Sequence, residues 1–74
     1  MDEYVKVTFP TRRRVWVDGQ QAGFTNKTFQ VETGSHRFDL GPTANYKPAQ
    51  QQRNVEGTLA EEPMIVAFKR VDGQ

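Results

Sequence analysis

The sequence predicts an all-β fold: a small, single-domain β-sandwich of about six or seven short, mainly antiparallel strands. Three observations lead to this prediction. Apolar and polar residues alternate over short runs, and turn residues such as Asp18-Gly19 and Thr33-Gly34 separate these runs at close, regular spacing. No window shows the apolar period of about 3.6 residues, with caps, that marks a helix. Residues 1–74 therefore form one domain, with an ordered core over about 4–71.

The first two predicted strands are Tyr4–Phe9 and Arg14–Asp18. Tyr4–Phe9 alternates Val5, Val7 and Phe9 with Tyr4, Lys6 and Thr8, and Pro10, which cannot donate a hydrogen bond to a neighbouring strand, ends it. Arg14–Asp18 runs into Asp18-Gly19, where both residues tolerate the positive φ of a tight hairpin.

Three further strands complete the first half of the chain. Gln21–Phe24 returns from the hairpin as a short strand, and Lys27–Val31 places Phe29 and Val31 on one face. After the Thr33-Gly34 turn, Ser35–Leu40 places His36, Phe38 and Leu40 on a common face, and Gly41-Pro42 ends that strand.

The second half of the chain is less regular. Thr43–Gln52 is polar and contains Pro48, which indicates a loop or irregular edge anchored by Tyr46, and Arg53–Leu59 is a weak strand around Val55. The last strand, Met64–Val71, carries apolar residues on both faces, because Ile65 and Ala67 lie opposite the core residues. This pattern predicts a central strand or an edge strand that a loop or partner covers.

Composition excludes several classes of function. The chain has no cysteine, so it forms neither disulfides nor Cys-based zinc or redox sites. Its net charge of +1 does not favour a polyanionic partner, and nucleic acid is not expected to be one. No apolar run is long enough to span a membrane, and the acidic start lacks a secretory signal. A cytoplasmic location follows if Met1 is the native start.

The candidate partner-binding residues are Arg12, Arg13, Arg14 and Trp16. Val15 and Val17 lie two apart and face the core, so Arg14 and Trp16 point outward. Tryptophan and arginine are the residues most enriched in binding hot spots. Tyr4 and Lys6 extend this surface if the first two strands lie side by side. The alternative is that Trp16 only caps the sheet, with Arg14 stacked on it.

The residues that could support catalysis do not form a convincing set. His36 is the only histidine and has neither a cysteine nor a second histidine with which to share a metal. We expect it to be half-buried and hydrogen-bonded to backbone. Asp18 is explained by its turn, and nothing in the pattern brings two carboxylates together as glycoside hydrolysis requires. The sequence therefore predicts no enzyme, no cofactor and no metal site.

Five short motifs follow one another in order along the chain. Pro10 precedes Val15-Trp16-Val17-Asp18-Gly19, after which come Gly23-Phe24-Thr25, Gly34-Ser35-His36-Arg37-Phe38 and Tyr46. This order, from about Val5 to Phe68, resembles the PEGA domain, a small β-sandwich module of bacterial and archaeal proteins. Three positions depart from the family pattern: Arg12-Arg13 replaces Gly-Ala, Asn26 replaces a proline, and Asn45 replaces the glycine before Tyr46.

The resemblance implies a non-enzymatic interaction module. PEGA domains are not known as enzymes and usually occur within larger surface, envelope or signalling proteins. A separate copy would be an accessory subunit or adaptor that docks on another, unidentified protein through the Arg–Trp face or an edge strand. The alternatives are a carbohydrate-binding module that uses Trp16 and Tyr46, and a weak nucleic-acid binder. A homodimer through an edge strand is a separate alternative.

Overall fold

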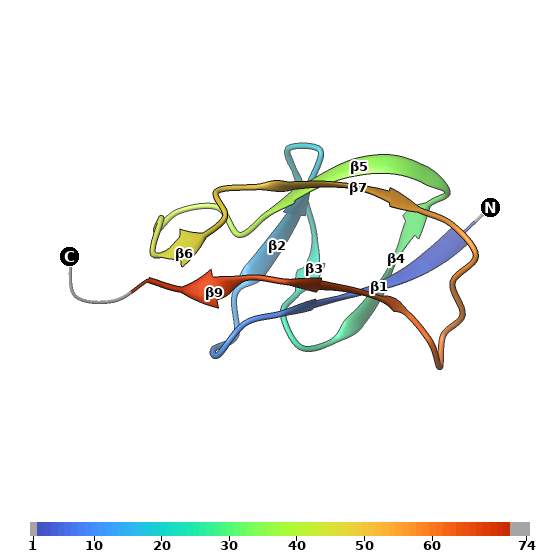
Figure 1. The fold of residues 1–74 in the computed structure, drawn as a ribbon, viewed down its shortest axis with the longest axis horizontal. Helices are drawn as coiled ribbons and strands as arrows, with labels where there is room; N and C mark the ends of the chain where they lie inside the picture. The colour runs from blue at the N-terminus through green and yellow to red at the C-terminus, as the bar shows by residue number, and fades with distance from the viewer. Residues whose placement is uncertain (1, 72–74) are drawn as a thin grey trace.

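Two β-sheets pack face to face around one apolar core in the computed structural model, which describes residues 2–71. The first sheet has the order β4-β1-β8 and the second has the order β3-β2-β5-β7, while β6 and β9 form a two-stranded extension at one end (Figure 1). The strands are β1 Asp2–Thr8, β2 Arg14–Val17, β3 Gln20–Phe24, β4 Thr28–Glu32, β5 Gly34–Asp39, β6 Tyr46–Lys47, β7 Gln51–Val55, β8 Met64–Ala67 and β9 Lys69–Arg70.

β1 is the middle strand of the three-stranded sheet. It pairs antiparallel with β4 and parallel with β8, and this parallel pair is the exception in an otherwise antiparallel arrangement of the described strands. Its alternation places Val5 and Val7 in the core and leaves Tyr4 and Lys6 partly exposed on the outer face. The inner face of β1 is therefore covered by the second sheet.

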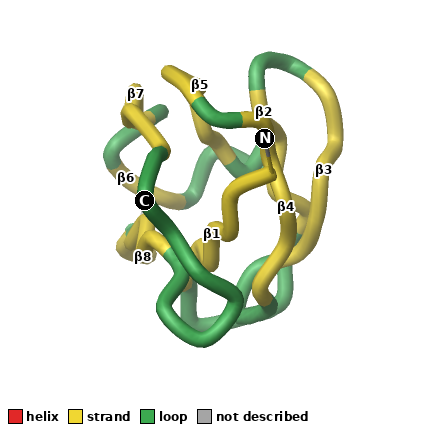
Figure 2. Tube along the Cα trace, turned by 90° about the vertical axis from the view of Figure 1, so that its right-hand side faces the viewer, coloured by secondary structure: helices red, strands yellow, loops and turns green. Residues whose placement is uncertain are grey.

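β2 occupies the corresponding place in the four-stranded sheet, between β3 and β5. The β2–β3 hairpin turns at Asp18 and Gly19, whose φ angles are 52° and 85°, so both residues adopt the left-handed conformation that their types tolerate. The register of the hairpin shifts between Val15 and Trp16, which marks a bulge. Figure 2 shows β3 beside β4 at one side of the sandwich.

The core consists of inward-facing aliphatic and aromatic side chains from both sheets. Burying each large side chain stabilises the fold by roughly 1.5–3 kcal/mol. The buried apolar residues are Val5, Val7, Phe9, Val15, Val17, Val31, Phe38, Leu40, Val55, Val66 and Phe68.

The prediction of an all-β sandwich is confirmed, and residues 2–71 contain no helix. The second half differs in detail from the predicted elements. β6 and the start of β7 lie within the segment expected to be a loop, and the last predicted strand is divided into β8 and β9 at Phe68. The alternation of β7 was difficult to recognise because two of its inward positions hold the polar residues Gln51 and Arg53.

β8 is an edge strand of its sheet within the described chain, so of the two predicted alternatives the central strand is excluded and the edge strand is found. Ile65 is 49% exposed on its outer face. The backbone edge of β8 is partly covered by the neighbouring β7, because Gln51 Nε2 donates a 2.7 Å hydrogen bond to the carbonyl oxygen of Ala67. This contact occupies an acceptor that an added strand would use.

Candidate functional site

The outer face of the four-stranded sheet carries the Arg–Trp row. Val15 and Val17 are buried, so Arg14 and Trp16 point away from the core. Across the strand pairs, Arg14 lies opposite Phe24 on β3, and Trp16 lies opposite Asp39 on β5. Aromatic, cationic and apolar groups are thus brought together at one end of this face.

A pocket of about 250 Å³ opens at that end. The candidate residues supply most of its lining, and the segment after β5 supplies the rest. We call it the arginine pocket, and its lining residues are Arg12, Arg13, Arg14, Trp16, Leu40 and Pro42. The structure therefore brings together four of the six sequence-predicted site residues.

The segment before β2 is held in place by the turn after β3. The hydroxyl oxygen of Thr25, which is buried, accepts a 2.8 Å hydrogen bond from the Arg13 N–H and donates one of 2.7 Å to the carbonyl of Thr11. Asn26 bonds to the backbone of Phe9 through both ends of its amide, at 2.8 and 3.3 Å. These contacts fix the backbone from which the three arginines project.

Arg13 is a structural residue, unlike its neighbours. Its guanidinium donates hydrogen bonds of 2.6 Å to Asn45 Oδ1 and 2.8 Å to the carbonyl of Thr43, with longer contacts of 3.3 and 3.4 Å to the carbonyls of Leu40 and Gly41. It thereby ties the loop after β5 to the segment before β2. Although it borders the pocket, most of its donors are already used.

Aromatic rings complete the surroundings of Arg13. Its guanidinium carbon lies 5.5 Å from the centroid of Phe9 and 5.4 Å from that of Tyr46, within the range of cation–π attraction. Tyr46 is itself fixed, because its hydroxyl donates to the carbonyl of Gly41 at 3.0 Å and its ring packs edge-on against Phe68. The Tyr46 side chain, one of the two aromatic groups named for a carbohydrate-binding module, is therefore held by contacts within the fold.

Trp16 packs against the backbone of Gly41. A Cβ atom at position 41 would lie 2.5 Å from the indole Nε1 and 2.9 Å from Cδ1. Gly41 also has a φ of +67°, which favours glycine. The close approach that only glycine permits thus sets the position of the indole at the pocket wall.

Arg12 and Arg14 are exposed and remain available to a ligand. The Arg12 guanidinium lies over the Phe24 ring, 4.3 Å from its centroid. The stacking of Arg14 on Trp16, which the alternative interpretation of this row included, is not among the cation–π contacts of residues 2–71. Within this described part of the chain, neither Arg12 nor Arg14 forms an ion pair with a carboxylate.

Tyr4 and Lys6 do not extend this surface. Their strand, β1, belongs to the three-stranded sheet, whereas β2 belongs to the four-stranded sheet. Both side chains face outward from the opposite side of the sandwich. The first two strands are consecutive in sequence but lie in different sheets. The condition under which Tyr4 and Lys6 would extend the Arg–Trp surface is therefore not met.

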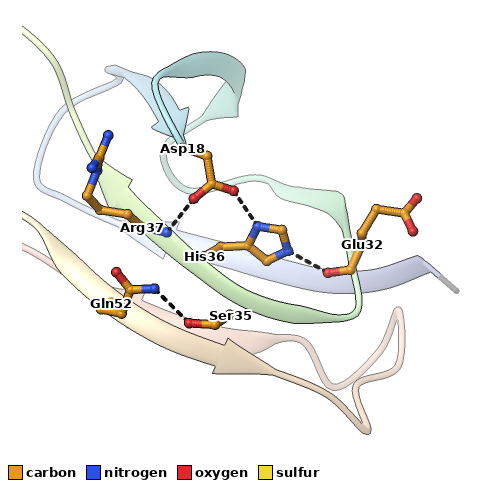
Figure 3. Close-up of polar contacts among 6 residues, drawn as sticks. All are labelled: Asp18, Glu32, Ser35, His36, Arg37 and Gln52. Atoms are coloured by element: carbon orange, nitrogen blue, oxygen red, sulfur yellow. Dashed lines mark hydrogen bonds and ion pairs between the residues drawn. The ribbon is translucent and has the colours of Figure 1, made fainter.

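The other end of β2 carries a paired charge cluster (Figure 3). His36 Nδ1 lies 2.6 Å from Asp18 Oδ2, and Nε2 lies 2.7 Å from the carbonyl oxygen of Glu32. The second carboxylate oxygen of Asp18 accepts the backbone N–H of Arg37 at 2.9 Å. Because both neighbours of the ring are acceptors, both nitrogens can bond only by donating, which favours the protonated imidazolium.

The pKa values at this cluster shift in opposite directions. The hydrogen bond to Asp18 raises the pKa of His36 above its usual value, and the same bond lowers the pKa of Asp18. With Nε2 bonded to a carbonyl, the ring offers no nitrogen to a metal or a substrate in this arrangement. The half-buried, backbone-bonded state expected for His36 is found, with Asp18 as an additional partner.

Glu3 forms a second paired group, on the inner face of β1. Its carboxylate accepts hydrogen bonds from the Thr58 hydroxyl at 2.6 Å, the Thr58 N–H at 2.9 Å and the Thr33 hydroxyl at 2.7 Å. These bonds, chiefly the one from the Thr58 hydroxyl, lower the pKa of Glu3 to about 2. The carboxylate therefore links β1 to two loops.

Within residues 2–71, no group of three or more histidine or acidic side chains is arranged to hold a metal ion. The same part of the chain contains no helix of the length and apolar character needed to cross a membrane. Comparisons with protein-family models, curated proteins and solved structures returned no match.

Sequence reasoning missed the structural role of Arg13 and three further participants: Phe24, Leu40 and Pro42. One signal was available for Arg13, because the alternation that places Val15 and Val17 inside also places position 13 on that side when extended by two residues. Phe24 becomes a neighbour of Arg14 through the hairpin register. Leu40 and Pro42 had no local signal, since they reach the pocket only through the pairing of β5 with β2.

Proposed function

We propose that the protein is a non-enzymatic interaction module, an accessory subunit or adaptor that binds another protein through the arginine pocket. The observation that carries this proposal is the presence of Trp16 and two exposed arginines, Arg12 and Arg14, around one open pocket. Tryptophan and arginine contribute the largest binding energies in protein interfaces.

The size of the pocket supports a protein partner over a small-molecule ligand. Sites for small molecules usually enclose about 300–1,000 Å³, whereas this pocket encloses about 250 Å³. It is suited to one inserted side chain. The surrounding outer face of the four-stranded sheet supplies the flat area that a protein interface of about 800 Å² per partner requires.

A second docking mode, strand addition at β8, is supported by the exposure of Ile65. The bond from Gln51 to the Ala67 carbonyl weakens this mode, because it occupies part of the edge. The resemblance to the PEGA family supports either mode, since it implies an interaction module without indicating a surface. The pocket is favoured because it combines shape, charge and an aromatic wall.

The test compares three single-residue variants for the capture of partners from native extract. Trp16→Ala removes the indole wall, Ile65→Lys places a charge on the β8 edge, and Lys6→Gln is a matched control on the opposite sheet. Each variant is first checked for the wild-type circular dichroism spectrum. Captured proteins are then quantified by mass spectrometry against the wild type.

The proposal predicts that Trp16→Ala loses at least one protein that wild type, Ile65→Lys and Lys6→Gln all retain. Loss with Ile65→Lys alone would assign docking to the edge of β8. Capture that is equal for folded Trp16→Ala and wild type would overturn the proposal.

A further inference from the structure

We infer that the arginine pocket binds an acidic peptide segment of the partner, with a Glu or Asp carboxylate held between Arg12 and Arg14 and an adjacent apolar group against Trp16 and Pro42. This inference rests on the proposed function and specifies the chemistry of its partner. It is argued from three features of the pocket: its charge, the groups still able to bond, and its position relative to the other cations.

Positive charge is concentrated at the pocket, whereas the chain as a whole is nearly neutral. The chain has ten Lys and Arg against nine Asp and Glu, a net charge of +1, yet three guanidiniums line this single site. Arg13 contributes charge although its donors are used, because its hydrogen-bond partners are carbonyl and amide oxygens and not carboxylates. Asp39, which lies opposite Trp16 on the same face, accepts the N–H of Gly41 and is not among the residues that line the pocket.

A carboxylate matches the groups that remain able to bond. Arg12 and Arg14 are exposed, and each presents a planar fork of N–H donors that fits the two oxygens of a carboxylate. The apolar wall is provided by Trp16, Leu40 and Pro42. A pocket lined by both cations and apolar groups favours an acidic side chain that is flanked by an apolar residue.

The cations outside the pocket lie on other elements of the fold. Binding along a phosphate backbone needs a continuous row of positive charge. Lys6 projects from the opposite sheet. Arg37 lies at the other end of β2, where its side chain comes within 4.0 Å of a Cβ built at Gly19. Lys47 and Lys69 lie opposite each other on β6 and β9, outside the pocket. These cations lie on separate elements, which favours a short acidic segment over a polyanion that needs one continuous row.

The test uses the indole of Trp16 as a reporter located in the pocket, since it is the only tryptophan of the chain. Wild-type protein is titrated with a capped octapeptide that alternates glutamate and alanine. Two further probes have the same format: the peptide with glutamine in place of glutamate, and an octamer of deoxythymidine. The readouts are the indole N–H resonance of Trp16 and its fluorescence.

Three variants test separately the charge of Arg14, the shape of its guanidinium group and the location of the arginine on the sheet face. Arg14→Gln removes the charge at the pocket, Arg14→Lys keeps the charge but not the fork, and Arg37→Gln removes an arginine from the distant end of the same face. We expect the glutamate peptide to shift the Trp16 resonance and its affinity to fall about fivefold in Arg14→Gln. A smaller loss is expected in Arg14→Lys, and none in Arg37→Gln.

Three results would overturn the inference. These are tighter binding of the deoxythymidine octamer, equal binding of the glutamate and glutamine peptides, and the absence of any shift of the Trp16 resonance with the glutamate peptide. In each case, the proposed function would still be supported if Trp16→Ala loses a native partner that the wild type captures. If Trp16→Ala retains full capture, the proposed function fails whatever the peptides do.

Discussion

The two ends of β2 differ in how their charged side chains are partnered. Asp18, the residue directly after the end of β2, is bonded to the His36 ring and to the backbone of Arg37. At its first residue, Arg14 lies beside Arg12 in a pocket where, within residues 2–71, neither pairs with a carboxylate. The paired end stabilises the fold, whereas the unpaired end is the one that we propose binds a partner.

The same contrast exists between adjacent residues. Arg13 points to the inner side, where it bonds to the loop after β5 and lies against the Phe9 and Tyr46 rings. Arg14 points outward into solvent. A run of three arginines is thus divided by strand geometry into one structural cation and two that remain available. Substitutions at these positions should therefore affect different properties.

The largest effect is expected at Arg13. Arg13→Ala removes hydrogen bonds from a charged donor and two cation–π contacts, and we expect it to lower the free energy of unfolding by about 2 kcal/mol. For a domain of this size, the melting temperature should fall by roughly 10 °C in thermal unfolding followed by circular dichroism. An unchanged melting temperature would contradict the distinction between Arg13 and Arg14.

A smaller loss of stability, accompanied by a loss of binding, is expected at Gly41. Gly41→Ala forces a Cβ against the Trp16 indole and places a side chain at a φ of +67°, which costs about 1 kcal/mol. The indole must move, so the pocket changes shape while all six lining residues remain. A crystal structure or the Trp16 indole resonance would detect this movement, and an unmoved indole would show that the close contact does not set its position.

The paired end should show a pH-dependent stability. The pKa of His36 is raised, so its stabilisation is present below the pKa of an unfolded histidine, about 6.5, and is lost as the pH rises through the folded value. The pKa of Asp18 is lowered, so its stabilisation is present above about 3.9 and is lost as the pH falls through its folded value.

Asp18→Asn tests this expectation because asparagine also tolerates the positive φ at position 18. The difference in melting temperature between wild type and variant should be greatest between about pH 4 and 6.5 and should shrink on both sides. A difference that does not vary with pH would show that the contact between Asp18 and His36 is not an ion pair.

The smallest effect on stability is expected at Arg14. Arg14→Gln removes an exposed charge without a carboxylate partner in the described chain, so the free energy of unfolding should change by no more than about 0.5 kcal/mol. Urea denaturation checks this value. A loss as large as that of Arg13→Ala would mean that Arg14 also belongs to the folding contacts and is not available to a partner.

Local sequence signals predicted the strands and turns that rest on neighbouring residues. The alternation around Val15 and Val17 placed Trp16 outside, and Asp18-Gly19 formed the hairpin turn. The same signals could not identify the partners of Arg13, because Asn45 and Thr43 lie 32 and 30 residues away in sequence. They also could not assign β1 and β2 to different sheets, since sheet order is set by long-range packing.

Site-specific photo-crosslinking in cells tests the central claim most directly. A benzophenone amino acid replaces Gln21, which pairs with Trp16 on β3, and in separate strains replaces Tyr4 on the opposite sheet or Ile65 on the edge strand. The account predicts a crosslinked adduct from position 21 whose yield falls when Arg14→Gln is added. An adduct from position 4 or 65 with none from position 21 would contradict it.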